Sequence, residues 1–254
     1  MSDTRGFELE VCVDRFADAM LAREAGATRV EWNQALDLDG LTPSVSGCRW
    51  LVRNLDIPVV AMIRPHDRGF MYTDQEFACM LEDCRAIVDA GVAGIVFGAL
   101  DAGGAIEWKS VEEIREVCSD VELIFHKAFD CLSPVEQLSA LPELGARGVS
   151  RILTSGGEPT VSEGAQQLKR LCEGRTGNFR VVGLEAKAGN ESSGTACEIL
   201  AGGGVSPGVI RRLHEETGCT QYHGSFRFGA ADMKVKEVEE AAAILIDLHA
   251  NESH

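Results

Sequence analysis

The feature that most constrains the fold of this 254-residue chain is a regular alternation of short apolar runs with longer amphipathic stretches. Eight of the runs have the length and bounding turn residues of β-strands. We predict strands at Glu8–Val13, Arg29–Asn33, Val59–Ile63, Gly94–Gly98, Glu122–Lys127, Ser150–Thr154, Glu198–Gly202 and Thr220–His223. Parallel strands need a crossover between them, usually a helix, so the alternation predicts a parallel sheet.

Helix start and stop signals agree with this division. Thr73 and Glu76 have the spacing of a capping box, and Pro134 lies where a first helical turn would begin. We predict helices at Phe16–Ala25, Gln75–Ala90, Val111–Cys118, Pro134–Leu144, Glu163–Cys172, Val209–Thr217 and Asp232–His249. Eight repeats favour closure into one (β/α)₈ TIM barrel, a single domain over residues 1–254. An open, doubly wound sheet is the alternative.

Composition excludes several functions. A net charge of -16 argues against a nucleic-acid partner, because binding phosphates needs a basic face. No apolar run approaches the roughly 20 residues of a membrane span, and no dinucleotide fingerprint is present, so we expect no membrane association and no nucleotide cofactor. The nine cysteines are scattered without a CxxC motif, which is typical of reduced thiols in the cytoplasm. The polar, glycine-rich residues 173–196 predict an extended loop before the seventh strand, or alternatively a lid.

Ionisable side chains gather at the predicted C-terminal ends of the strands, where parallel α/β folds place their active sites. The fifth strand ends in Phe-His-Lys-Ala-Phe-Asp, which supplies three candidate catalytic residues, His126, Lys127 and Asp130. Arg64, at the end of the third strand, could hold a carboxylate or phosphate in a forked geometry. Lys127 could also act as a Schiff-base nucleophile.

The first strand is expected to carry polar side chains into the barrel. Because strand side chains alternate, Glu10 and Cys12 share the face opposite the apolar residues. A glutamate inside a strand needs a partner, so we predict that Glu10 and Glu31 meet other polar groups, one of them serving as a general base. His223 ends the eighth strand, beside the first strand in a closed barrel, and is a candidate substrate-binding residue. The alternative is a buried ion-pair network without catalysis.

Glycine turns follow the sixth and seventh predicted strands. Small residues let backbone N–H groups approach an anion, and the helix that begins after Ser206 adds a favourable dipole. The candidate anion-binding residues are Ser155, Gly156, Gly157, Gly202, Gly203 and Gly204. Barrel phosphate sites usually follow strands seven and eight, so these turns are offset by one strand. Tight turns without a ligand are the alternative.

Seven motifs stand in order along the chain. They are Leu9-Glu10-Val11-Cys12, Gly40-Leu41-Thr42-Pro43-Ser44, Met62-Ile63-Arg64-Pro65, Val96-Phe97-Gly98-Ala99-Leu100, Phe125-His126-Lys127-Ala128-Phe129-Asp130, Leu153-Thr154-Ser155-Gly156-Gly157 and Gly202-Gly203-Gly204-Val205. This set resembles the CutC family, named for copper homeostasis, over about residues 7–228. The resemblance implies a (β/α)₈ barrel, a cytoplasmic location, a homo-oligomer and Cu(I) bound by cysteines.

The chain departs from the pattern of the family it resembles. Asn33 stands where the family usually has a cysteine after the second strand, and Lys127 and Ala201 replace an arginine and a proline. The loss of one thiol weakens the copper interpretation, because Cu(I) prefers sulfur ligands. Cys12 remains as a metal ligand, with the thioether of Met62 as a second donor.

Two functions follow from these observations. The resemblance implies a copper-associated barrel protein that binds or handles Cu(I). The strand ends, rich in carboxylate, imidazole and guanidinium and poor in sulfur, instead predict an enzyme. That enzyme would be a lyase or isomerase that moves a proton on a small anionic, possibly phosphorylated metabolite. A non-catalytic scaffold is a third interpretation, which leaves the charged strand ends unexplained.

Overall fold

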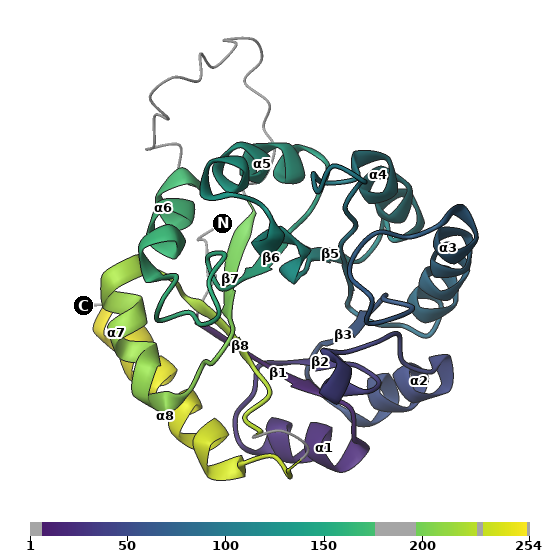
Figure 1. Ribbon diagram of the computed structural model, residues 1–254. Helices are drawn as coiled ribbons and strands as arrows, with labels where there is room; N and C mark the ends of the chain where they lie inside the picture. The colour runs from purple at the N-terminus through teal and green to yellow at the C-terminus, as the bar shows by residue number, and fades with distance from the viewer. Residues whose placement is uncertain (1–6, 176–196, 228–230, 253–254) are drawn as a thin grey trace.

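The strands of the protein close into a parallel barrel in the order β1-β2-β3-β4-β5-β6-β7-β8 (Figure 1). This computed structural model describes residues 7–175, 197–227 and 231–252. The strands are β1 (Glu8–Val13), β2 (Arg29–Trp32), β3 (Val59–Met62), β4 (Gly94–Phe97), β5 (Glu122–Phe125), β6 (Arg151–Thr154), β7 (Glu198–Gly202) and β8 (Gln221–Gly224). Closure between β1 and β8 confirms the predicted barrel and excludes the open sheet.

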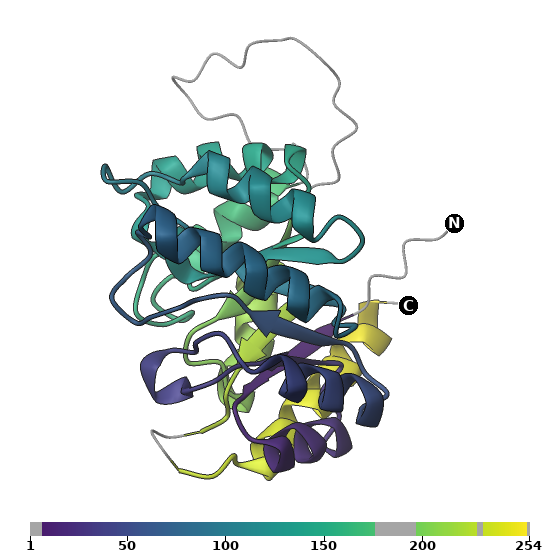
Figure 2. The same cartoon turned by 90° about the vertical axis from the view of Figure 1, so that its right-hand side faces the viewer.

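In the part of the chain that the structure describes, eight α-helices surround the strands (Figures 1 and 2). They are α1 (Phe16–Glu24), α2 (Val45–Asn54), α3 (Asp74–Val88), α4 (Trp108–Val117), α5 (Pro134–Ala146), α6 (Ala165–Arg175), α7 (Pro207–Thr217) and α8 (Val235–Glu252). Two short 3₁₀ helices, η1 (Leu36–Leu38) and η2 (Lys127–Cys131), follow β2 and β5. Among the described residues, no helix is both long enough and apolar enough to cross a bilayer.

Three local differences separate the structure from the predicted elements. Helix α2 was not predicted, because its buried face consists of Gly47, Cys48 and Leu51, a weak apolar pattern. Strand β5 ends at Phe125, because the backbone turns into η2 at Lys127. Residues 173–175 complete α6, and residues 176–196 of the predicted loop lie outside the described residues.

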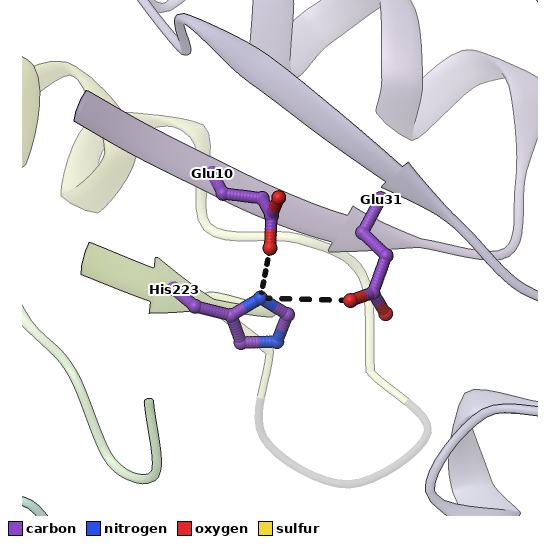
Figure 3. A group of neighbouring side chains, drawn as sticks. All are labelled: Glu10, Glu31 and His223. Carbon is purple, nitrogen blue, oxygen red and sulfur yellow. Dashed lines mark hydrogen bonds and ion pairs between the residues drawn. The ribbon is translucent and has the colours of Figure 1, made fainter. Parts of the chain in front are cut away.

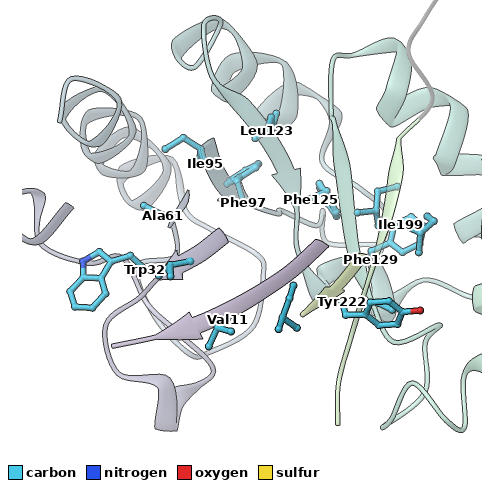
Figure 4. Close-up of a cluster of buried hydrophobic side chains, with 14 of the residues drawn as sticks. Val11, Trp32, Ala61, Ile95, Phe97, Leu123, Phe125, Phe129, Ile199 and Tyr222 are labelled. Atoms are coloured by element: carbon cyan, nitrogen blue, oxygen red, sulfur yellow. The ribbon is translucent and has the colours of Figure 1, made fainter. Parts of the chain in front are cut away.

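The alternation of strand side chains divides the core into two layers. Outward-facing residues such as Val11, Phe97 and Tyr222 pack beneath the helices (Figure 4). The inward-facing apolar layer is a separate small cluster of Val60, Met62, Val96, Ile124, Leu153 and Leu200. Because this layer fills the middle of the barrel, the remaining inward-facing polar residues are divided between its two ends. A cavity opens at the C-terminal end.

Candidate functional site

A cavity of about 740 Å³ opens at the C-terminal end of the barrel. Strand ends and the loops that follow them form its wall, as barrel active sites require. The lining residues are Cys12, Glu31, Leu36, Asp37, Asp39, Met62, Arg64, Phe70, His126, Lys127, Leu153, Gly203, Gly204, His223, Gly224, Ser225 and Arg227. The structure thus brings many of the predicted site residues to one place.

One wall is built across the seam where β1 meets β2 and β8. The register sets Glu10 opposite His223 and Cys12 opposite Glu31. His223 Nδ1 lies 2.7 Å from Glu10 Oε1 and 3.9 Å from Glu31 Oε2 (Figure 3). Glu10 does not line the cavity; its other carboxylate oxygen accepts a hydrogen bond of 2.5 Å from Arg29 Nε.

Glu10, Glu31 and His223, which we call the seam cluster, carry different charges. Burial raises the pKa of Glu10, but Arg29 and His223 outweigh burial and lower it to about 2. Burial also raises the pKa of Glu31, and the nearby Glu10 adds to that increase. Burial lowers the pKa of His223, yet Cys12 and the two carboxylates raise it well above its usual value. Glu10 is therefore a fixed anion, His223 a cation, and Glu31 the carboxyl that holds a proton most readily.

Glu31 is oriented but not fully paired. Asn33 Nδ2 donates a hydrogen bond of 2.7 Å to Glu31 Oε1, while Glu31 Oε2 is buried without a hydrogen-bond partner. Glu10, Glu31 and His223 each offer a ligand atom within 4.8 Å of the others, a spacing that suits a metal ion. Arg29 already neutralises Glu10, and His223 already carries a proton, so the charges of this set are balanced without a metal.

Two sulfur donors line the cavity. Cys12 is buried, lines the cavity and forms a hydrogen bond with His223. Met62 lines the same cavity from β3. A thiol, a thioether and an imidazole fit Cu(I), which prefers sulfur and tolerates nitrogen ligands. Asn33 offers no soft donor, so a Cu(I) ion here would have one thiolate at most.

Another part of the wall carries Arg64, His126 and Phe70. Burial and the nearby Arg64 lower the pKa of His126 to about 3, so its imidazole is neutral. His126 Nδ1 accepts a hydrogen bond of 3.2 Å from the backbone N–H of Ala128, which places the ring proton on Nε2. A side chain at Gly98 would place its Cβ only 2.4 Å from His126 Nδ1, so this position leaves no room for more than a hydrogen atom.

Asp130 has a structural position rather than a place in the cavity wall. Its carboxylate accepts hydrogen bonds from the backbone N–H groups of Ser155 and Gly157 and from the Thr154 hydroxyl. These contacts fix the turn after β6, and neither that turn nor Asp130 lines the cavity. Lys127 does line it, with Nζ 3.7 Å from an Asp130 carboxylate oxygen.

The predicted glycine turns therefore have different positions. Ser155, Gly156 and Gly157 lie behind the wall, whereas Gly203 and Gly204 line the cavity. Gly202 lies at the end of β7, where an added Cβ would come within 2.4 Å of Leu153 and 3.2 Å of His223. Gly202 thus provides the space that His223 occupies.

Several lining residues were not predicted. Asp37 and Asp39 come from η1 and its end, and Phe70, Ser225 and Arg227 come from loops. Residues in loops follow no hydrophobic periodicity, so the direction of their side chains could not be predicted from the sequence. Arg29, the partner of Glu10, was also missed; its position two residues before Glu31 on the same face of β2 is the signal that could have found it.

Comparison with known proteins places the chain in a family. A family model described as the CutC family matches residues 7–228. The chain belongs to the CutC family. It is 35% identical to a CutC family protein of Treponema denticola over 219 residues, 86% of this chain and 81% of that protein. It is 34% identical to the human copper homeostasis protein cutC homolog, over 87% of this chain and 74% of that protein.

A solved CutC structure has the same fold. The putative copper homeostasis protein CutC of Streptococcus agalactiae superposes with a TM-score of 0.74 at 30% identity. The match covers 86% of this chain and 98% of that protein. The CutC family therefore accounts for the barrel and for the order of its motifs, and Asn33 is a feature of this chain that its site must accommodate.

Proposed function

We propose that this CutC protein takes part in copper homeostasis by binding Cu(I) at the barrel mouth through Cys12. The observation that carries the proposal is the position of Cys12: among the described cysteines, it is the one that lines the cavity, and it touches His223. The names of the human and Streptococcus agalactiae relatives point to copper. The chemistry of Cys12, Met62 and His223 suits the cuprous ion.

Charge also supports a monovalent ion at this position. A thiolate and Cu(I) together are neutral, whereas a divalent ion would add charge to a wall that already contains Arg29. Metal ligation requires a deprotonated thiol and a neutral imidazole, so Cu(I) binding would release protons from Cys12 and from His223. With Asn33 in place of a second thiol, Met62 and the imidazole supply the remaining ligands.

An anaerobic Cu(I) titration of the reduced protein against a chromophoric chelator tests the proposal. We expect one Cu(I) to pass from the chelator to each chain, and Cys12→Ser to abolish the transfer. Cys131→Ser is the matched control, because Cys131 is exposed and lies outside the cavity lining. If the chelator keeps all of the copper, or if Cys131→Ser loses as much as Cys12→Ser, the proposal is wrong.

We propose as a second function proton transfer on a small anionic metabolite, with Glu31 as the general base. The specific observation is that Glu31 lines the cavity, has a raised pKa and presents an oxygen without a hydrogen-bond partner. A raised pKa brings a carboxyl closer to the pH at which it both accepts and donates protons. The positive charge of His223 stabilises the negative charge on Glu31 when the proton has left.

Deuterium exchange can detect this step before the full reaction is known. Copper-free protein would be incubated in D₂O with small carboxylates and phosphate esters, and loss of C–H signal would be followed by proton NMR. We expect exchange in at least one compound, abolished by Glu31→Gln and retained by Glu113→Gln on α4, outside the cavity lining. Exchange that survives Glu31→Gln would refute the role of Glu31.

A further inference from the structure

We propose that Arg64, His126 and Lys127 form a binding site for the oxyanion group of a small metabolite, a carboxylate or a phosphate ester. This site would bind the substrate of the proposed proton transfer and defines its chemical class. It rests on that proposed function only in taking the cavity as the place of the reaction. It does not depend on copper. The contacts of each residue carry the argument.

Arg64 is a buried cation without an anionic partner in the described part of the chain. It is 5% exposed, and its Nη1 donates to three backbone carbonyls, those of Leu38 at 3.0 Å, Asp39 at 3.3 Å and Gly40 at 3.2 Å. Arg64 Nε is buried and makes no hydrogen bond. Buried arginines are normally paired with carboxylates, and an unpaired one is costly. The carbonyls orient the guanidinium but do not neutralise its charge.

His126 supplies a second buried donor nitrogen that has no hydrogen-bond partner in the described structure. The residue is 3% exposed, and its Nε2, which carries the proton, makes no hydrogen bond in the described structure. Buried polar groups without partners are rare in native proteins and need an explanation. An acceptor atom of a bound ligand would give the Nε2–H group of His126 the hydrogen bond that it lacks.

These two donors belong to one wall of the cavity. The ring of Phe70 lies 4.9 Å from the ring of His126 and 5.2 Å from the Arg64 guanidinium carbon. All three residues line the cavity. Arg64 and His126 each keep one buried nitrogen without an acceptor in the described structure, and a positive charge beside a neutral donor is complementary to a negatively charged group with more than one oxygen.

Lys127 extends the positive wall toward the solvent. Its side chain is 42% exposed, and an added Cβ on Gly203 would lie only 3.3 Å from its Nζ. The ammonium therefore lies over the turn formed by Gly203 and Gly204, which leads into α7. A partly exposed cation at the entrance, beside a backbone without side chains, gives the oxyanion group a second point of attachment.

The charge distribution sets the orientation of the ligand. Glu31, Asp37 and Asp39 also line the cavity, and their carboxylates repel an anion, so the donors of Arg64 and His126 are the part of the lining that attracts one. A volume of about 740 Å³ falls within the roughly 300–1,000 Å³ of metabolite pockets, so the site accommodates more than an isolated ion. The oxyanion group therefore lies against Arg64 and His126, and the rest of the metabolite points toward Glu31.

Calorimetric titration of the copper-free protein with inorganic phosphate and with acetate, at constant ionic strength, tests the proposal. We expect one bound anion per chain. The affinity for the anion should be about tenfold lower, or lower still, in His126→Leu and in Lys127→Met. His126→Gln, which keeps an N–H donor, should recover part of the affinity. Lys109→Met is the control, because Lys109 is an exposed lysine of α4 outside the cavity.

The two probes separate the two sources of the oxyanion. Tighter binding of phosphate assigns the site to phosphate esters, and tighter binding of acetate assigns it to carboxylates. If neither binds, or if Lys109→Met weakens binding as much as Lys127→Met, the proposal is wrong. Because Lys127 is half exposed, its variant tests the site even if His126→Leu does not fold. Binding without deuterium exchange would leave this site standing and refute the proton transfer alone.

Discussion

Two histidines of one cavity are held in opposite protonation states. His126 faces Arg64 and apolar rings, so burial lowers its pKa to about 3. His223 faces Cys12 and two carboxylates, which raise its pKa well above the usual value although burial opposes the shift. Environments that push pKa values apart are how a site assigns separate acid and base roles. Here His126 is a neutral donor toward a ligand, and His223 is the counter-ion of the carboxylates.

The buried neutral His126 makes stability depend on pH. The unfolded chain protonates this histidine below about pH 6.5, whereas the folded protein does not until about pH 3, so the unfolded state binds more protons between these values. The free energy of unfolding should therefore decrease as the pH falls, by about 2–3 kcal/mol between pH 6.5 and 4.5. Urea denaturation at several pH values measures the decrease.

His126→Gln should remove most of this decrease, because glutamine does not titrate. His249→Gln, at an exposed histidine of α8, should retain it. Equal slopes for the wild-type protein and His126→Gln would show that His126 does not carry the effect.

At the scale of the elements, short connections place the cavity residues. Strand β5 ends at Phe125, His126 caps η2, and α5 begins at Pro134, so eight residues lead from the strand to the outer helix. The start of α5 is fixed by a capping box in which Ser133 Oγ accepts from the Glu136 N–H and the Glu136 carboxylate accepts from the Ser133 N–H. This cap also fixes the end of the segment that carries Lys127.

The serines at two helix starts give a matched comparison. Ser133→Ala removes a cap hydrogen bond and should lower the free energy of unfolding by about 1 kcal/mol. Ser206 occupies the same position before Pro207 of α7 but its side chain makes no cap hydrogen bond, so Ser206→Ala should change stability by less than about 0.5 kcal/mol. Thermal and urea unfolding of both variants give the two values. Equal losses would mean that the Ser133 cap is not the cause.

At the scale of the whole molecule, the two ends of the barrel differ in whether the buried arginines of the described residues are paired with carboxylates. At the N-terminal end, Arg151 Nε donates a 2.8 Å hydrogen bond to Gln221, and the same guanidinium pairs with Glu122 and lies 3.5 Å from Glu8. These contacts join four strands across the barrel. At the C-terminal end, Arg64 and His126 keep donors without partners in the described structure. The network at the N-terminal end therefore stabilises the barrel, whereas the donors at the C-terminal end are available to a ligand.

Arg151 should accordingly matter for stability rather than for ligands. Arg151→Met leaves the carboxylates of Glu8 and Glu122 without this cation and should cost about 3 kcal/mol of unfolding free energy. Arg211→Met, which breaks a surface pair with Asp247 whose side chains are 47% and 55% exposed, should cost less than about 1 kcal/mol. Urea denaturation compares them. A loss for Arg151→Met as small as for Arg211→Met would refute the role of the cross-barrel network.

The sequence by itself determined the fold and most of its elements, because strand alternation, capping signals and eight repeats are local patterns that one barrel satisfies. Alternation also placed Glu10 and Cys12 on the inner face of β1. Tertiary structure decided what those side chains meet: that Arg29 rather than a ligand neutralises Glu10, that Asp130 holds the turn after β6, and that Arg64 is left without a carboxylate. Periodicity gives the face of a residue, whereas its partners come from strands and loops distant in sequence, and only closure of the barrel brings them together.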